Sequence, residues 1–572
     1  MTVLRSARHL WALLILATGL AGLALPATAA NPPAVSERFM VSTANPLATM
    51  AARDIILQGG SAVDAAIAAQ LVLTLTEPQS SGLGGGAFLL TFDAASGAVA
   101  SYDGRETAPA AATPDLFLRP DGSVMDWTEA AEGGISVGVP GVLAMLEMAH
   151  GEHGRLPWAD LFGPAIALAQ NGFILSPRLH EVLDWVEGPE RFPAFYHQFY
   201  ALDGTRKPVG TRLTNPALAQ TLRVLARDGS DAFYRGAIAE EIVAAVGDTQ
   251  VNPGAMTLAD LAGYQAVRRD PVCTPYRTWT VCGMGPPSSG GIAVAQILGL
   301  LERFDMAAVQ PGSLEAVHLI AEAERLAYAD RDMFVADSDF VAVPLEALLD
   351  PAYLAGRSAL IDPAASMGIA QPGLAPGDRA AFDDETNLGL STSHISIVDQ
   401  EGNAVSMTTS IERGFGSRLM AGGFLLNNEL TDFAFEAQVD GLPVANRVEA
   451  GKRPRSSMAP TLVLDQDGGV VMAIGTVGGS RIICYVAKTL IARLDWGLDI
   501  QAAIELPHFL NRNGTTELEE GTDLVALVPA LEAMGHEVTL GTMDTGLAGF
   551  FIEGGTITGG ADPRREGTAL GR

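Results

Sequence analysis

Two different periods of apolar and polar residues divide the chain. Along the first two-thirds, apolar positions recur three and four residues apart, which is the spacing of packed helices. Residues 46–58 and 62–75 form two alanine-rich segments of this kind, and Ser61 with Asp64 makes a capping box for the second. The same spacing predicts further helices over residues 143–150, 158–170, 216–228, 230–246 and 313–336, the last with an acidic face.

The last third of the chain alternates with a period of two, which is typical of strands. Residues 393–398 and 404–409 alternate on either side of a turn, and residues 461–464 and 470–474 repeat the pattern around a second turn. A helix is predicted after Gly478 and Gly479, with Ser480 as its N-cap and an end near Leu494. Antiparallel hairpins flanked by helices predict an α+β fold in which stacked sheets are covered by helices.

The N-terminus has the pattern of a secretory signal. Arg5 and Arg8 precede an apolar run over residues 10–25, and Ala27-Thr28-Ala29 fits the small-residue cleavage pattern. The run is short for a membrane span, and no second run of spanning length follows it. We therefore predict a signal peptide over residues 1–29, a periplasmic or secreted protein, and no membrane anchor. An uncleaved anchor is the alternative.

The net charge of the chain limits the classes of partner that it is expected to bind. The 572 residues include 66 acidic and 36 Lys or Arg residues, which gives a formal net charge of −30 at pH 7. Such a surface repels phosphate backbones and anionic lipid headgroups. The charge therefore argues against nucleic acid and against an anionic membrane as partners, and it says little about the fold.

The three cysteines suggest one disulfide. Residues 272–282 alternate about a turn centred on Arg277 and Thr278, which would place Cys273 opposite Cys282. Export favours a cross-strand disulfide between these two residues. Cys484 follows two isoleucines and is predicted to be a buried thiol. An odd cysteine count without a C-x-x-C motif gives no zinc pattern, so no metal site is predicted.

Thr392 is the residue with the most specific chemistry. It directly precedes the predicted strand over residues 393–398 and follows a loop-like stretch with acidic residues at 383–385. Cleavage of the bond between Ser391 and Thr392 would give Thr392 a free α-amine beside its own hydroxyl. Nucleophile and general base would then come from one residue. A threonine that simply opens a strand is the alternative interpretation of this segment alone.

Motifs on both sides of Thr392 carry a family resemblance. They lie at residues 59–66, 77–86, 105–109, 286–291, 414–418, 425–433, 452–461 and 478–481. In this order, and with Thr392, they resemble the γ-glutamyltransferase family, also called γ-glutamyltranspeptidases or glutathione hydrolases. The resemblance implies the four-layer αββα sandwich of the N-terminal nucleophile hydrolases and no cofactor. It also implies self-cleavage into a large subunit (30–391) and a small subunit (392–572) that stay together as one interleaved heterodimer.

The resemblance also implies a role for each site residue. Thr392 would attack a γ-glutamyl amide while the backbone N–H groups of Gly478 and Gly479 hold the oxyanion, although a glycine pair alone equally fits a tight strand-to-helix turn. A guanidinium suits a carboxylate because it binds bidentately. The implied substrate-binding residues are Arg105, Ser456 and Ser457 for the α-carboxylate, and Glu429 and Asp432 for the α-ammonium. Taken singly, each of these charges is more typical of a solvated surface.

Three features depart from the family pattern. The hydroxyl residue in the second strand of the nucleophile hairpin is Ser410, where the family usually has threonine. Glu412 stands where many members have asparagine, so it either makes the amine pocket more acidic or marks a different acyl group. The segment from Asp432 to Ser456, which is the family's lid, is shorter than usual. A shorter lid admits more water and favours hydrolysis over transfer to amino acids.

Three functions are compatible with these residues. The first is an exported, self-processed hydrolase and transferase of γ-glutamyl amides, with glutathione as the natural candidate substrate. The second is an acylase on the same scaffold that takes another dicarboxylic acyl group, such as a glutaryl amide. The third is an unprocessed binding protein, against which the intact Thr392 and both glycines argue.

Overall fold

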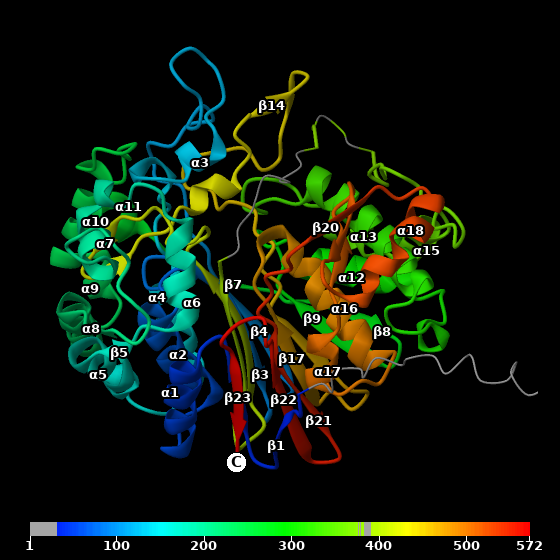
Figure 1. The fold of residues 1–572 in the computed structure, drawn as a ribbon, viewed down its shortest axis with the longest axis horizontal. Coiled ribbons are helices and arrows are strands. Elements are labelled where there is room, and N and C mark those ends of the chain that lie inside the picture. Colours follow the sequence, from blue (N-terminus) through cyan, green and yellow to red (C-terminus); the bar gives the residue numbers. More distant parts are fainter. Residues whose placement is uncertain (1–30, 376, 378, 382–390) are drawn as a thin grey trace, which may run out of the picture. The chain divides into compact units, whose positions relative to one another are not determined.

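Two seven-stranded sheets organise the segment Pro33–Arg572 in the computed structural model, which describes residues 31–375, 377, 379–381 and 391–572 (Figure 1). The predicted signal peptide and the acidic residues at 383–385 lie outside the described residues. In spatial order, the first sheet consists of β1 (Ala34–Ser36), β22 (Thr556–Ala561), β21 (Ala548–Glu553), β17 (Val470–Gly475), β16 (Thr461–Leu464), β9 (Trp279–Gly283) and β8 (Val272–Tyr276). The second consists of β23 (Thr568–Gly571), β2 (Met40–Thr43), β10 (Ser393–Val398), β11 (Ala404–Ser410), β3 (Gly86–Asp93), β4 (Ala98–Gly104) and β7 (Val267–Arg269).

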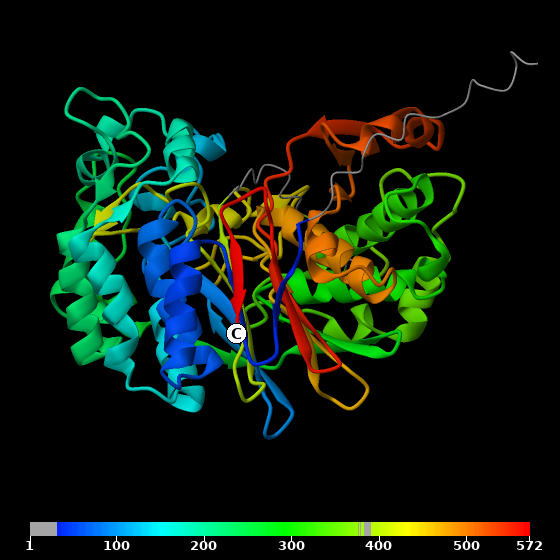
Figure 2. The same ribbon diagram turned by 60° about the horizontal axis from the view of Figure 1, so that its bottom comes forward.

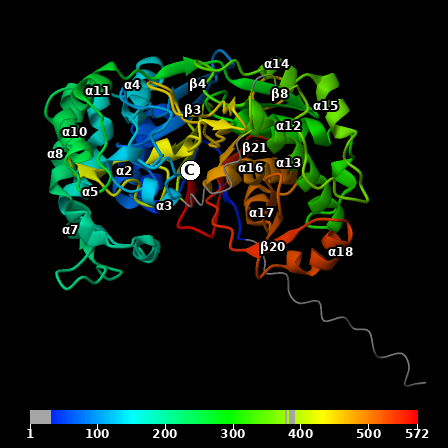
Figure 3. The same cartoon turned by 90° about the horizontal axis from the view of Figure 1, so that it is seen from above.

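Helices cover the outer face of each sheet (Figures 2 and 3). The second sheet is covered by helices that include α1 (Pro46–Leu57), α2 (Ala62–Thr76), α4 (Val142–His153), α5 (Gly163–Asn171), α8 (Pro216–Asp228) and α10 (Ala237–Gly247). The first is covered by α12 (Gly290–Leu301), α13 (Leu314–Phe334), α16 (Ile482–Leu494) and α17 (Ile500–Glu505). A third apolar cluster, which includes Leu90, Val398 and Phe550, lies between the sheets. The layers are therefore αββα, as the resemblance implied. Within the described residues, none of the helices combines the length and apolar character needed to cross a bilayer.

Shorter elements complete the architecture and carry the loops around the sheets. They include α3 (Trp127–Ala130), α6 (Pro177–Val182), α7 (Pro193–Phe199), α9 (Asp231–Tyr234), α11 (Leu258–Gly263), α14 (Leu345–Leu348), α15 (Pro351–Ser358) and α18 (Val528–Ala533). The small strands pair as β5 (Phe173–Ile174) with β6 (Arg212–Leu213), β12 (Met420–Ala421) with β13 (Phe424–Leu425), and β14 (Gln438–Val439) with β15 (Leu442–Pro443). A three-stranded sheet joins β18 (Phe509–Asn511), β19 (Thr516–Glu519) and β20 (Val538–Gly541).

Each large sheet mixes strands from both sides of the predicted cleavage point. In the first sheet, β1, β8 and β9 precede Ser391, whereas β16, β17, β21 and β22 follow Thr392. In the second, β10, β11 and β23 follow Thr392 and pair directly with β2 and β3, which precede it. A cut between Ser391 and Thr392 would therefore leave two chains that share both sheets and every apolar layer.

Strand alternation in β10 separates an apolar face from a polar one. Ile395 and Ile397 point into the core beneath α1 and α2, and the intervening residues face the first sheet. There the Ser396 hydroxyl donates to the Ala548 carbonyl at 3.0 Å, and the His394 ring contacts the Thr408 hydroxyl at 2.9 Å. Burial lowers the pKa of His394 to about 3, so its ring is neutral. His394 thus belongs to the packing between the sheets.

The predicted disulfide is confirmed. β8 and β9 pair antiparallel with Cys273 opposite Cys282, and the two sulfurs are bonded at 2.05 Å. The turn between them passes through Arg277, whose φ is 54°. Cys484 is free and buried in α16, as predicted.

The predicted helix cap at Ser480 is wrong. The chain makes a short 3₁₀ turn over Gly479–Arg481 before α16 begins at Ile482, so Ser480 lies inside that turn. The helix expected over residues 230–246 is also interrupted, because Gly236 adopts a φ of 77° between α9 and α10. The acidic face predicted for α13 is mostly buried: Glu322, Glu324, Asp330 and Asp332 lie inside the protein, and Glu315 is exposed.

Candidate active site

Thr392 lies where the β10–β11 hairpin meets the end of the inter-sheet layer. The hairpin register pairs Ser393 with Thr409, so Thr392 and Ser410 are the next residues across from each other. The Thr392 hydroxyl donates to the Ser410 hydroxyl at 3.3 Å. Thr392 has a φ of 150°, which is unusual for a β-branched residue and costs about 1–3 kcal/mol. The fold therefore concentrates backbone strain at the predicted scissile bond.

A buried ion pair supports Thr392 from below. Arg565 donates to the carbonyl oxygen of Thr392 at 3.3 Å and to the Asp544 carboxylate at 2.9 Å. Asp544 also accepts from Arg178 at 3.0 Å. On the other side, the Ser81 hydroxyl bonds to the hydroxyl of Ser393 at 3.1 Å. Sequence reasoning assigned no role to these residues.

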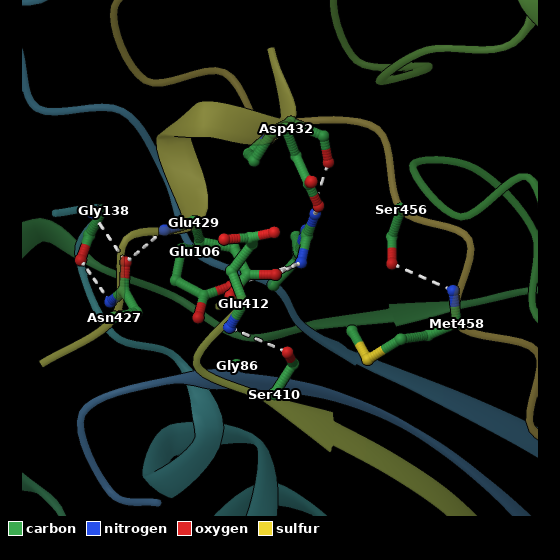
Figure 4. Close-up of polar contacts among 12 residues, drawn as sticks. Gly86, Glu106, Gly138, Ser410, Glu412, Asn427, Glu429, Asp432, Ser456 and Met458 are labelled. Atoms are coloured by element: carbon green, nitrogen blue, oxygen red, sulfur yellow. Dashed lines mark hydrogen bonds and ion pairs between the residues drawn. The ribbon is translucent and has the colours of Figure 1, made fainter. Parts of the chain in front are cut away.

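Ser410 connects the nucleophile to Glu412. The backbone N–H of Glu412 donates to the Ser410 hydroxyl at 2.8 Å (Figure 4). Glu412 has a φ of 74°, a conformation that non-glycine residues seldom adopt. Its carboxylate accepts from the Asn428 side-chain amide at 2.6 Å. The turn therefore places Glu412, which departs from the family pattern, two residues after Ser410, the hydrogen-bond partner of Thr392.

Arg105 and the predicted acidic residues come together, as expected. The fully buried guanidinium of Arg105 bonds to Glu429 and Asp432 and to the carbonyl oxygen of Arg455 at 3.0 Å. Burial would lower the pKa of Arg105, but the carboxylates of Glu429 and Asp432 raise it above its ordinary value. Glu106 lies 3.8 Å from the same guanidinium. In the uncleaved chain, the guanidinium of Arg105 is therefore paired with these acidic residues.

Burial has the largest effect on the pKa values of these acids. It raises the pKa of Glu429 to about 7, an effect that Arg105 partly offsets. It also raises the pKa of Glu412 and Glu106 well above their usual range, helped by repulsion from neighbouring carboxylates. Figure 4 shows Glu106, Glu412, Glu429 and Asp432 gathered in one place. These acids therefore bind protons more readily than isolated carboxyl groups do.

One small cavity joins most of the predicted residues. It has a volume of about 30 Å³, which exceeds the roughly 10–15 Å³ that a single water molecule needs. Because Ser391 contributes to its wall, the uncleaved chain leaves no room for an acyl group. The lining residues are Ser391, Thr392, Ser410, Glu412, Glu429, Asp432, Arg455, Ser456, Ser457, Met458, Gly479 and Ile482. Arg105 and Gly478 are predicted site residues that lie behind this lining.

Two serines form the wall opposite the acids. The Ser456 hydroxyl accepts from the backbone N–H of Met458 at 3.1 Å (Figure 4). The Ser457 hydroxyl accepts from the buried guanidinium of Arg331 at 2.7 Å. A hydroxyl that accepts a bond keeps its own proton to donate. The wall is thus suited to an anion, and Arg331 supports it without having been predicted.

The two glycines adopt conformations that other residues avoid. Gly478 has a φ of 130° and Gly479 a φ of 59°, at the end of the segment that follows β17. Tyr328 bonds to the carbonyl oxygen of Ser480, and Arg512 donates to its hydroxyl at 2.8 Å. These contacts fix the glycine turn beside the cavity. No local pattern predicts these contacts, because they depend on tertiary packing.

One group of side chains has the spacing of metal ligands within the described residues. His318, Glu322 and His536 are buried, and their ligand atoms lie within 4.8 Å of one another. His318 and His536 already bond to each other at 2.8 Å, and Glu322 bonds to Arg325 at 3.0 Å. None of them lines the Thr392 cavity, so this cluster has no part in the site.

Comparison with known proteins identifies the class of enzyme. The family model for gamma-glutamyltranspeptidase matches residues 48–572. The chain is 36% identical over 553 residues to the glutathione hydrolase proenzyme of Bacillus subtilis, covering 94% of this chain and 92% of the relative. It is 33% identical over 554 residues to the Acylase ACY 1 proenzyme of Pseudomonas sp. strain SE83, covering 95% of each. The crystal structure of cephalosporin acylase from Bacillus halodurans has the same fold, with a TM-score of 0.82 at 24% identity over 97% of this chain and 99% of that one.

The chain therefore belongs to the γ-glutamyltranspeptidase family. It is an enzyme of the γ-glutamyltransferase and glutathione hydrolase class, with the N-terminal nucleophile hydrolase fold. The names of its relatives, as proenzymes, support processing into two subunits.

Replacing Ser410 tests the hairpin geometry. We expect Ser410→Ala to slow both maturation and turnover on the order of 100-fold, because Thr392 loses its acceptor and the N–H of Glu412 is left buried without one. Ser410→Thr, which keeps the hydroxyl, should behave like the wild type. The measurement is a time course of chain cleavage on denaturing gels, followed by kcat. Wild-type rates in Ser410→Ala would show that this contact does not align the nucleophile.

Proposed function

We propose that this protein is an exported, self-processed hydrolase of γ-glutamyl amides such as glutathione. The observation that carries the proposal is the placement of Thr392 against Ser410, in a cavity with acids on one wall and hydroxyl donors on the other. Membership of the γ-glutamyltranspeptidase family supports it. The disulfide between Cys273 and Cys282 supports export, because such bonds persist in oxidising compartments. The leader would be residues 1–29.

Self-cleavage would use the Thr392 hydroxyl on the preceding peptide. The hydroxyl oxygen attacks the carbonyl carbon of Ser391, the C–N bond breaks as an ester forms, and the freed nitrogen takes the hydroxyl proton. Water then hydrolyses the ester and leaves the Ser391 carboxylate and a free Thr392. The strained φ of Thr392 favours this step, since cleavage releases the constraint. The products are chains 30–391 and 392–572.

Catalysis would then use the new α-amine of Thr392 as the base. The amine takes the hydroxyl proton as the oxygen attacks the γ-carbonyl carbon of the substrate. The backbone N–H groups of Gly478 and Gly479 stabilise the oxyanion. The leaving amine departs with a proton from the Thr392 ammonium, and a γ-glutamyl ester of Thr392 remains. Water, activated by the same amine, releases glutamate.

The α-amino acid end of the acyl group would lie between the two polar walls. Ser456 and Ser457 donate to the α-carboxylate, while Glu412, Glu429 and Asp432 surround the α-ammonium. Arg105 is held by Glu429 and Asp432 in the uncleaved chain. Substrate binding would exchange part of this ion pair, so that Arg105 turns to the carboxylate and Asp432 to the ammonium. A zwitterion replaces one buried ion pair by two.

A second function, an acylase for a dicarboxylic acyl group such as glutaryl, is favoured by one observation, the 33% identity to an acylase proenzyme. A glutaryl group has the carboxylate but no ammonium. The γ-glutamyl function needs the carboxylate of Asp432, and the glutaryl function does not.

Replacing Asp432 separates these functions. We expect Asp432→Asn to lower kcat/KM for a γ-glutamyl anilide about 100-fold or more, since a buried ammonium loses its counter-charge. The glutaryl anilide should be affected only slightly. Asp248→Asn, a change at an exposed position, is the matched control. An equal loss for both anilides, or better turnover of glutaryl by the wild type, would contradict the γ-glutamyl proposal.

The lid leads us to expect hydrolysis to exceed transfer. The segment after Asp432 forms the exposed β14–β15 hairpin and returns at Asn446, whose side chain bonds to both Asp432 and Arg455. Among the described residues that line the cavity, none lies between 433 and 454. We therefore expect the lid to leave water access to the ester.

With a γ-glutamyl anilide and a dipeptide acceptor such as glycylglycine, free glutamate should be the main product. Chromatography of the two products measures this. Comparable rates of hydrolysis and transfer would contradict the expectation.

A further inference from the structure

The acidic wall of the site brings four carboxyl groups close together. Glu412, Glu429 and Asp432 line the cavity, and Glu106 lies directly behind them. The single guanidinium of Arg105 is shared between Glu429 and Asp432. The other guanidinium at the cavity, that of Arg455, is 3.4 Å from Asp332. These four carboxyl groups thus lie close together in one buried wall.

Glu412 is the least compensated of these groups. It is 4% exposed, and no arginine or lysine among the described residues lies within ion-pair distance of it. One carboxylate oxygen accepts from Asn428, and the other accepts no hydrogen bond from any described residue. Glu429 likewise has one buried oxygen that accepts no bond. Two carboxyl oxygens therefore present unused acceptor capacity beside the cavity.

A buried carboxyl group without a cation has two ways to avoid the cost of its charge. It binds a proton, or a ligand brings a cation. A primary ammonium offers three N–H donors, which matches the three carboxyl groups that line the cavity. A proton and a substrate ammonium therefore compete for the same place.

We propose that Glu412 makes this wall exchange a proton for the substrate's ammonium, so that acyl-group preference changes with pH. At higher pH the ionised wall selects the γ-glutamyl group. At lower pH the protonated wall accepts a glutaryl group, which has the same carbon chain without the amine. This inference rests on the proposed function, because it concerns the acyl site of the same reaction.

The groups that face Glu412 fit this exchange. From the 3₁₀ turn Glu429–Asp432 come two carboxylates, whose repulsion adds to the effect of burial in raising the pKa of Glu412. From the end of β4 come Arg105 and Glu106. On its own segment, Arg413 stacks over Trp127 with its guanidinium 5.1 Å from the ring centre. The pKa of Glu429, about 7, lies inside the physiological range.

The sign follows from these charges. As pH rises, the wall loses protons and its affinity for an ammonium increases. The same change weakens glutarate binding, because an unbalanced carboxylate wall repels a dianion. Below pH 7.5 the α-amine of glutamate stays protonated, since α-amines titrate near about pH 8 or above. A shift in preference across this range is then caused by titration of the protein and not of the ligand.

The test is calorimetric binding of L-glutamate and of glutarate to the processed enzyme at pH 6.0, 6.75 and 7.5. We expect the ratio of the glutarate Kd to the glutamate Kd to rise about tenfold or more across this range, as one exchanged proton requires. Glutamate should release protons and glutarate should take them up, which titrations in two buffers of different ionisation enthalpy detect.

Two variants make the test specific. Glu412→Gln keeps the acceptor for Asn428 but cannot ionise, and it should reduce the pH dependence of the ratio to the part that Glu429 contributes. Glu401→Gln removes a half-exposed carboxylate at the far end of the same hairpin and should leave the wild-type slope. A ratio that does not change with pH in the wild type, or an unchanged slope in Glu412→Gln, would overturn the proposal.

Binding and turnover separate this proposal from the proposed function. Turnover of γ-glutamyl anilides with a ratio independent of pH would overturn the proton exchange alone. Failure to turn over γ-glutamyl anilides, with a pH dependence of the ratio that is reduced in Glu412→Gln, would overturn the proposed function and support the exchange. No binding of either ligand would overturn both.

Discussion

The antiparallel pairing of β10 with β11 is the constraint on which the rest of the site depends. Its register places Thr392 across from Ser410, and alternation along β10 turns its polar residues toward the other sheet. The pair is clamped between β2 and β3 and covered by the helical layer. Cleavage at Thr392 would therefore free an N-terminus that cannot move away. A nucleophile held by a buried sheet needs little further ordering before it reacts.

The low dielectric of the protein interior is the second factor that determines how the charged residues of the site are arranged. The fully buried Arg105 pairs with Glu429 and Asp432, and the buried Arg565 bonds to the carbonyl of Thr392 and to Asp544. In water these pairs would contribute little, but inside the protein each unpaired charge is costly. In the proposed function, the acids of the acyl site would bind a proton or a substrate ammonium and so offset that cost.

The sequence predicted the local features and missed the tertiary ones. Period-two alternation located β10 and the hairpin that bears the disulfide, because these patterns are local. The family motifs predicted that Arg105, Glu429 and Asp432 share one site. Arg565, Tyr328 and Arg512 were missed, since each acts through tertiary packing, Arg565 and Tyr328 across more than 150 residues, that leaves no local pattern. Ser480 was misplaced because two glycines with left-handed φ values start a 3₁₀ turn instead of a helix.

Self-processing at Thr392 is the central claim, since the base, the nucleophile and the open acyl site all depend on it. The most direct measurement is the mass and N-terminal sequence of each chain in the mature, active protein. The account predicts two chains that remain associated, the smaller beginning at Thr392. A single intact chain with full hydrolase activity, or a small chain that begins elsewhere, would contradict it.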